Sequence, residues 1–144
     1  MKLRENDISF GLLVLRLIMG LTFISTGIFK IAGYPHIVTV MTDGFAETWL
    51  PDFLLVPFFY VLPWIETTVG ALTLLGLFTR PVLYVMGLLL VIINFGLSVQ
   101  GNFTTALNNI PYFIIIGLDI ILLNYNKYSL DNLFFGKKSQ GASA

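Results

Sequence analysis

The chain has 144 residues, of which 56% are hydrophobic, 15% aromatic and only 11% charged, whereas soluble globular domains carry roughly 25% charged residues. This composition argues against a soluble domain and indicates one small domain in a lipid bilayer. The formal net charge is zero, so nothing points to nucleic acid, and the lack of cysteine excludes disulfides, thiolate catalysis and cysteine-bound metals.

Four apolar runs are long enough to cross a membrane, because a bilayer core of about 30 Å needs roughly 20 apolar residues per helix. The runs cover residues 10–31, 53–78, 81–99 and 107–125. The connection between the second and third runs is so short that these two helices must form an antiparallel hairpin. We therefore expect an all-α membrane protein, a four-transmembrane-helix antiparallel bundle over residues 1–130, followed by a polar cytoplasmic tail over residues 131–144.

The distribution of basic residues predicts the orientation of the bundle, because lysine and arginine stay on the cytoplasmic side of membranes. Near the ends of the spans, Lys30 alone falls on one side. The other side holds Lys2, Arg4, Arg80, Lys127, Lys137 and Lys138. Both termini are therefore predicted to be cytoplasmic.

A short amphipathic segment lies between the first two predicted spans. Ile37, Met41, Phe45 and Trp49 recur every four residues, which is the spacing of one helix face, and Gly44 should end the helix. We expect a short interfacial helix here, at the outer surface of the membrane.

On each of the first two spans, charged residues, which are costly to expose to lipid, share one helix face with small residues. On the first span they recur at steps of three and four, as Arg16, Gly20, Phe23, Gly27 and Lys30; the second span repeats the pattern with Glu66, Gly70 and Thr73. Because glycine lets two helix backbones approach closely, these faces should contact other helices and not lipid. Arg16 and Glu66 are then predicted to point into the bundle.

The last two spans each add polar groups, Asn94 on the third and Tyr112 and Asp119 on the fourth. A lone charged residue at the centre of a transmembrane helix costs about 2.5 to 3.5 kcal/mol, so burial favours pairing. We infer an Arg16–Asp119 pair, with Glu66 and Asn94 completing one buried network. Two acids beside one guanidinium leave one acid in excess, and Glu66 is the candidate for carrying a proton. The alternative is that the network only fixes the register of the helices.

Two further residues lie outside this network. Lys30, at the end of the first span, is a candidate ligand-binding residue and is expected to extend toward water or to pair with Asp43 or Glu47. His36 is the only histidine and should lie in the surface segment between the first two spans. A single histidine cannot form a metal site, so no metal is expected, and its position outside the spans argues against haem.

The ordered motifs of the chain resemble a known family. The series Arg16-x3-Gly20-x2-Phe23-x3-Gly27-x2-Lys30, then Glu66-x3-Gly70, then Gly76-Leu77-x-Thr79-Arg80, is similar to the DoxX family of small bacterial membrane proteins. The likeness extends over about residues 10–125. It implies a multi-pass protein of the bacterial inner membrane, related to the DoxD-type subunit of thiosulfate:quinone oxidoreductase and to proteins of redox defence.

These observations lead to one leading hypothesis about function. The protein would be a redox-associated membrane subunit that binds quinone, where Arg16 or Asn94 donates to a carbonyl, Glu66 supplies a proton, and Phe23, Trp64 and Tyr112 lie against the ring. A soluble or peripheral oxidoreductase would be its partner, and it could form a homo-oligomer. The alternatives are a small-molecule or proton-coupled transporter and a non-catalytic scaffold or assembly factor, so whether the chain is an enzyme stays open.

Overall fold

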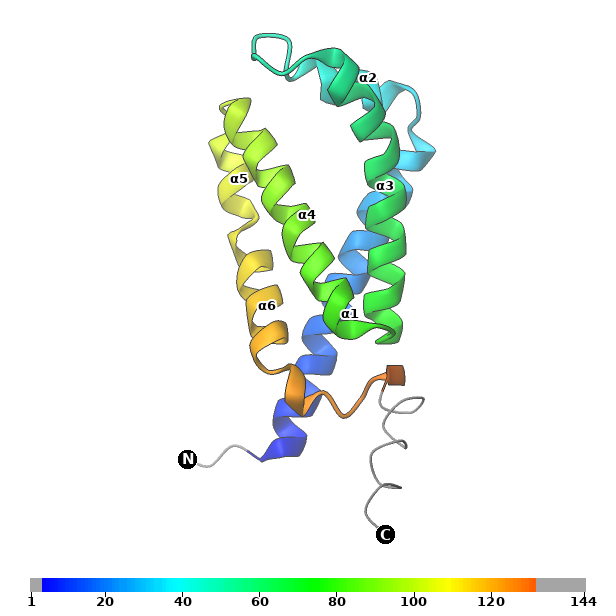
Figure 1. Ribbon diagram of the computed structural model, residues 1–144, viewed down its shortest axis with the longest axis vertical. Coiled ribbons are helices and arrows are strands. Elements are labelled where there is room, and N and C mark those ends of the chain that lie inside the picture. Colours follow the sequence, from blue (N-terminus) through cyan, green and yellow to red (C-terminus); the bar gives the residue numbers. More distant parts are fainter. Residues whose placement is uncertain (1–3, 132–144) are drawn as a thin grey trace.

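The computed structural model describes residues 4–131, and every regular element in that range is a helix (Figure 1). The elements are α1 (Glu5–Ala32), α2 (His36–Asp43), α3 (Asp52–Leu75), α4 (Thr79–Val99), α5 (Phe103–Asn108), α6 (Ile110–Ile121) and a short 3₁₀ turn, η1 (Leu123–Tyr125). Of the predicted tail, only Asp131 belongs to the described part of the chain.

Four stretches of the described chain are long and apolar enough to cross a membrane. They are α1, α3, α4 and the pair α5–α6, which together cover Phe103–Ile121. Large apolar side chains such as Phe29, Phe53, Leu88 and Ile121 are exposed on the outside of these helices, as expected for surfaces that face lipid. The predicted helical membrane bundle and its number of spans are therefore confirmed.

The fourth span differs from its predicted form. It begins at Phe103 instead of residue 107, and it is divided into two helices at Asn109. Asn102 caps the first helix by accepting a hydrogen bond from the Thr105 N–H. Pro111 follows the break, and because proline has no N–H it cannot continue the hydrogen-bond ladder of α5. The span is thus interrupted where a proline stands in its apolar sequence.

The turn between α3 and α4 makes these two helices an antiparallel hairpin, as predicted. The Leu77 N–H donates to the Leu72 carbonyl and the Gly76 N–H to the Thr73 carbonyl, which is the Schellman pattern at a helix end. Gly76 has a φ of 67°, a conformation that glycine adopts without a steric penalty.

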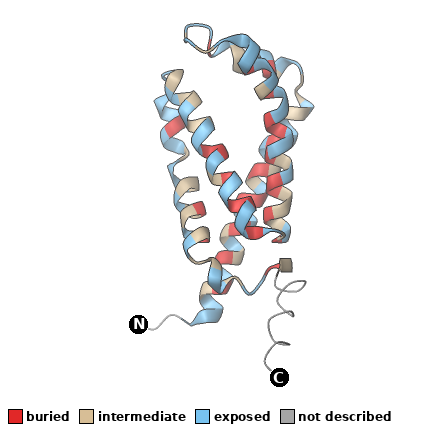
Figure 2. Cartoon of the chain, viewed as in Figure 1, coloured by how far each residue is buried: buried red, intermediate tan, exposed pale blue. Residues whose placement is uncertain are grey.

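Helices α1 and α3 lie in close backbone contact at two glycines. A Cβ atom on Gly20 would lie 2.9 Å from the Gly70 carbonyl oxygen, and one on Gly70 would lie 2.8 Å from the Gly20 carbonyl oxygen. Neither backbone can move to admit a side chain without separating the helices. The prediction that the small-residue faces contact each other is confirmed, and Figure 2 shows buried residues gathered where α1, α3 and α4 meet.

The bundle has two distinct ends (Figure 1). We call the end with the start of α1, the α3–α4 turn and η1 the terminal end, and the end with α2 and the α4–α5 connection the distal end. Helix α2 forms where the short helix was predicted, ends at Asp43 before Gly44, and packs on α3. Its place at the membrane surface, like the cytoplasmic position of the termini, stays a prediction.

The close approach of α1 and α3 can be tested with a single added methyl group. Gly20→Ala should lower the free energy of unfolding by about 1 to 3 kcal/mol, because the new Cβ overlaps the backbone of α3. Thermal unfolding in detergent measures the effect. Gly117→Ala is the matched control, since a Cβ there meets nothing within 4 Å and alanine favours a helix more than glycine does. Equal melting temperatures for the two variants would contradict the crossing.

Candidate functional site

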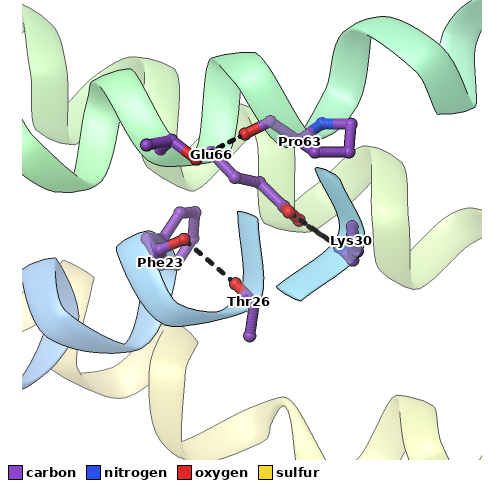
Figure 3. Close-up of polar contacts among 6 residues, drawn as sticks. Phe23, Thr26, Lys30, Pro63 and Glu66 are labelled. Carbon is purple, nitrogen blue, oxygen red and sulfur yellow. Dashed lines mark hydrogen bonds and ion pairs between the residues drawn. The ribbon is translucent and has the colours of Figure 1, made fainter. Parts of the chain in front are cut away.

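A buried ion pair joins α1 to α3 near the distal end. The Lys30 ammonium donates to both carboxylate oxygens of Glu66, at 2.6 and 2.7 Å (Figure 3). Glu66 is 3% exposed, and the side chain of Lys30 is 20% exposed. Charge-assisted hydrogen bonds of this kind are the strong ones, so the two side chains hold each other in a fixed geometry inside the apolar bundle.

The neighbouring backbone explains why this pair can form. A Cβ atom on Gly27 would lie 2.7 Å from the Pro63 carbonyl oxygen, so α1 lies directly against α3 one turn before Lys30. The Pro63 carbonyl accepts a hydrogen bond from the Thr67 hydroxyl, and the Phe23 carbonyl accepts one from Thr26 (Figure 3). With these hydroxyls bonded within their own helices, Glu66 takes its hydrogen bonds from Lys30.

The expectation that Lys30 reaches water, or pairs with Asp43 or Glu47, is wrong. Gly27 lies opposite Pro63, whereas α3 begins at Asp52, so about three turns of α3 extend beyond the level of this contact. Lys30 is near the end of its own helix but not at the edge of the bundle. Its long side chain meets Glu66 before it meets solvent.

A cavity of about 230 Å³, which we call the polar cavity, opens beside the ion pair. It lies between α1, α3, α4 and the α5–α6 junction. Its lining residues are Thr22, Phe23, Thr26, Lys30, Glu66, Leu90, Ile93, Asn109 and Tyr112. Four of the residues proposed from the sequence, Phe23, Lys30, Glu66 and Tyr112, therefore come together here. Asn94 is linked to the same cavity because its side-chain oxygen accepts a hydrogen bond from Asn109 at 3.4 Å.

A second and larger cavity, about 510 Å³, lies between α2, α3 and α4, where α4 diverges from α3 toward the distal end (Figure 1). We call it the apolar cavity, because most of its lining is aliphatic or aromatic, including Met41, Phe45 and Phe59. Lys30 and Ile93 line both cavities. The ion pair thus stands at the junction of a polar and an apolar compartment, an arrangement suited to an amphipathic ligand.

Arg16 and Asp119 form a separate cluster at the terminal end. Arg16 is 4% exposed and Asp119 3% exposed, and both line one small cavity. The Arg16 guanidinium donates to the Asn126 side-chain oxygen at 2.9 Å and to the Tyr128 carbonyl. Its charge interacts with that of Asp119, but no direct hydrogen bond joins the two among the contacts of the described residues.

The predicted single network is therefore wrong, and two clusters take its place. Fourteen residues separate Arg16 from Lys30, which is about 21 Å along a helix. Glu66 is satisfied by Lys30 and Asn94 is bonded to Asn109, so neither reaches the guanidinium. Arg16 instead holds the segment that follows α6.

Trp64 does not face the site as the sequence analysis expected. It is 58% exposed and lines neither cavity. Residues two positions apart on a helix point in directions that differ by roughly 200°, so a buried Glu66 places Trp64 on the outer surface of α3. The exposed His36 likewise lies outside both cavities.

Several site residues were missed by the sequence analysis. Asn109 lines the polar cavity because the fourth span breaks there, and the neighbouring Pro111 was the signal that could have revealed it. Asn126 and the Tyr128 carbonyl bind Arg16, but a backbone acceptor in a connecting segment leaves no sequence signal. The Asp131 carboxylate accepts from the N–H groups of Phe78 and Thr79 at the start of α4, again without any motif.

The ion pair should contribute measurably to stability. Glu66→Gln removes the carboxylate and leaves a buried ammonium, so we expect a loss of up to about 3 kcal/mol, the lower end of the range for buried pairs because Lys30 is partly exposed. The double variant Lys30→Met/Glu66→Leu should lose less than Glu66→Gln alone, because no unpaired charge remains.

Thermal unfolding in detergent measures these differences. Glu5→Gln is the control, since the Glu5–Lys127 ion pair is exposed on both sides and exposed pairs contribute little. The assignment fails if Glu66→Gln melts at the same temperature as Glu5→Gln.

In a comparison with protein families, the DoxX family model aligns with residues 11–99. The matched region spans nearly all of α1 through α4 and includes Arg16, Lys30 and Glu66. It leaves out α5 and α6, which supply Tyr112 and Asp119. No match is found among curated proteins or solved structures.

Proposed function

The chain belongs to the DoxX family, whose model covers more than half of its length, and we propose that it is a redox-associated membrane subunit that binds a lipid-soluble quinone beside the Lys30–Glu66 ion pair. The proposal places the protein in the bacterial inner membrane with both termini cytoplasmic. Of the network expected from sequence, Arg16, Glu66, Asn94 and Asp119, the proposed site keeps Glu66 as the proton carrier and leaves out Arg16 and Asp119, while Lys30 becomes the donor.

The junction of the two cavities at the ion pair carries this proposal. A quinone combines a flat ring bearing two carbonyls with a long apolar tail, and the polar and apolar cavities offer a compartment for each. The apolar cavity of about 510 Å³ falls within the usual range of ligand pockets, about 300 to 1,000 Å³. The terminal-end cavity, at about 10 Å³, is too small for such a ring.

The donors present fit a quinone carbonyl. An ammonium group has three N–H donors, and Lys30 uses two of them on the Glu66 oxygens, which leaves one for a ligand. Phe23 and Tyr112 supply aromatic walls from α1 and α6. In the proposal, Glu66 fixes the direction of Lys30 and exchanges a proton at its carboxylate, while Lys30 orients the carbonyl by hydrogen bonding.

A bound quinone would supply two-electron, two-proton redox chemistry. Since the chain has no cysteine, the proposal assigns the electrons to a partner oxidoreductase that meets the subunit at the membrane. The chain's own part would be to bind and orient the ring, to keep its surroundings apolar, and to hold a proton at Glu66.

Binding of a quinone analogue to the purified protein tests the proposal. Lys30→Met/Glu66→Leu should weaken binding about 10- to 100-fold, the loss expected for one hydrogen bond to a charged group, without leaving a buried charge. Trp64→Leu is the control, because Trp64 lies outside both cavities, and it should bind like the unmodified protein.

Equal affinity in the double variant and the unmodified protein would contradict the site. If neither protein binds quinone, but proteoliposomes show a flux that Glu66→Gln abolishes, the transporter hypothesis replaces it. If neither binding nor flux is seen, but affinity purification retains partner proteins with both the unmodified protein and the variants at positions 30 and 66, the scaffold hypothesis replaces the quinone site.

A further inference from the structure

The small cavity at the terminal end is surrounded by polar groups from three helices. Arg16 comes from α1, Thr79 is the first residue of α4, and Asp119 lies near the end of α6. All three line the same cavity of about 10 Å³, together with Leu12, Leu83, Leu123 and Asn126. The cavity plays no part in the proposed quinone site, which lies about 21 Å away along α1.

Four polar atoms around this cavity have no hydrogen-bond partner among the described residues. They are the Arg16 Nε, the Thr79 Oγ1 and both carboxylate oxygens of Asp119. Each of these three residues is at most 4% exposed, so bulk water does not reach them. Buried polar groups in proteins are nearly always hydrogen-bonded, and a carboxylate with neither oxygen bonded is a large exception. The arrangement calls for a ligand that satisfies several groups at once.

The chemistry of the cavity identifies that ligand. The guanidinium of Arg16 would repel a metal cation, and the carboxylate of Asp119 would repel an anion. The ligand is therefore neutral overall. It must accept from the Arg16 Nε–H, donate to Asp119, and exchange a hydrogen bond with the Thr79 hydroxyl, which both donates and accepts. A cavity of about 10 to 15 Å³ with two to four polar partners is what a single buried water molecule needs.

We propose that Arg16, Thr79 and Asp119 hold one buried water molecule that bridges the guanidinium to the carboxylate. The water turns two charges that share a cavity without a direct hydrogen bond into a connected pair. A carboxylate bonded to water inside a helical bundle is also the arrangement from which membrane proteins build proton relays.

The same site supports the segment that follows α6. Arg16 bonds to Asn126 and to the Tyr128 carbonyl, while Asp131 accepts from the N–H groups of Phe78 and Thr79 at 2.7 Å each. In Figure 1 this segment, coloured orange, crosses from α6 toward the α3–α4 turn at the terminal end. Asn126 lines the same cavity, so the water would link α1, α4 and α6 next to the point where Arg16 holds this segment.

A double-mutant cycle on melting temperature tests the bridge. Thr79→Val removes one partner of the water and Asp119→Asn removes its charged acceptor. Because the two side chains make no direct hydrogen bond, a bridge predicts that Thr79→Val lowers the melting temperature by several degrees in the unmodified protein and by clearly less in the Asp119→Asn background. Strictly additive shifts would overturn the proposal.

Thr73→Val is the matched control for this cycle. The Thr73 hydroxyl is as buried as that of Thr79, but it donates to the Val69 carbonyl within its own helix, so its effect should be the same in both backgrounds. If a variant fails to fold, an experimental structure of the unmodified protein shows directly whether the water is present. Density within hydrogen-bond reach of Arg16 Nε, Thr79 Oγ1 and an Asp119 oxygen supports the water, and a map that shows other buried waters but none here overturns it.

Discussion

The ion pair between Lys30 and Glu66 is the interaction on which the arrangement of the distal half depends. Either charge alone would be costly inside an apolar bundle, and together they form two short hydrogen bonds. The pair requires that α1 lie directly against α3, which the absence of a side chain at Gly27 permits. The same contact, repeated at Gly20 and Gly70, fixes the two helices as a unit. The polar and apolar cavities lie where α4, α5 and α6 pack less closely against the α1–α3 pair.

Helix α1 organises the rest of the molecule through two cations on one face. Arg16 lies at the terminal end and Lys30 lies near the distal end, and each binds residues of other elements. Lys30 meets a carboxylate on α3, whereas Arg16 meets the segment after α6 and shares a cavity with Asp119. The separation of the two clusters gives them different chemistry. The distal cluster borders cavities large enough for a lipid-soluble molecule, and the terminal cluster encloses space for a single water.

The inward faces of the helices could be predicted from the sequence, because repeats of glycine and charge at steps of three and four are a property of one helix at a time. Which charges meet could not be predicted. That depends on how far one helix extends past another, as the contact of Gly27 with Pro63 shows for Lys30. Trp64 was expected at the site from its residue type alone, although its position two residues from Glu66 already placed it on the opposite face. The partners of Arg16 include a backbone carbonyl, which no side-chain pattern can reveal.

The central claim is that Lys30 and Glu66 are hydrogen-bonded inside the bundle, and a direct distance measurement in bilayers tests it. With the protein labelled at lysine ¹⁵Nζ and glutamate ¹³Cδ, dipolar recoupling by solid-state NMR should detect the close nitrogen–carbon pair of Lys30 and Glu66 beside that of the exposed Lys127 and Glu5. The Lys30–Glu66 contribution should disappear in Glu66→Gln and persist in Glu5→Gln. A spectrum in which Glu66→Gln removes no close pair would show that these two charges do not meet, and the site built on them would be wrong.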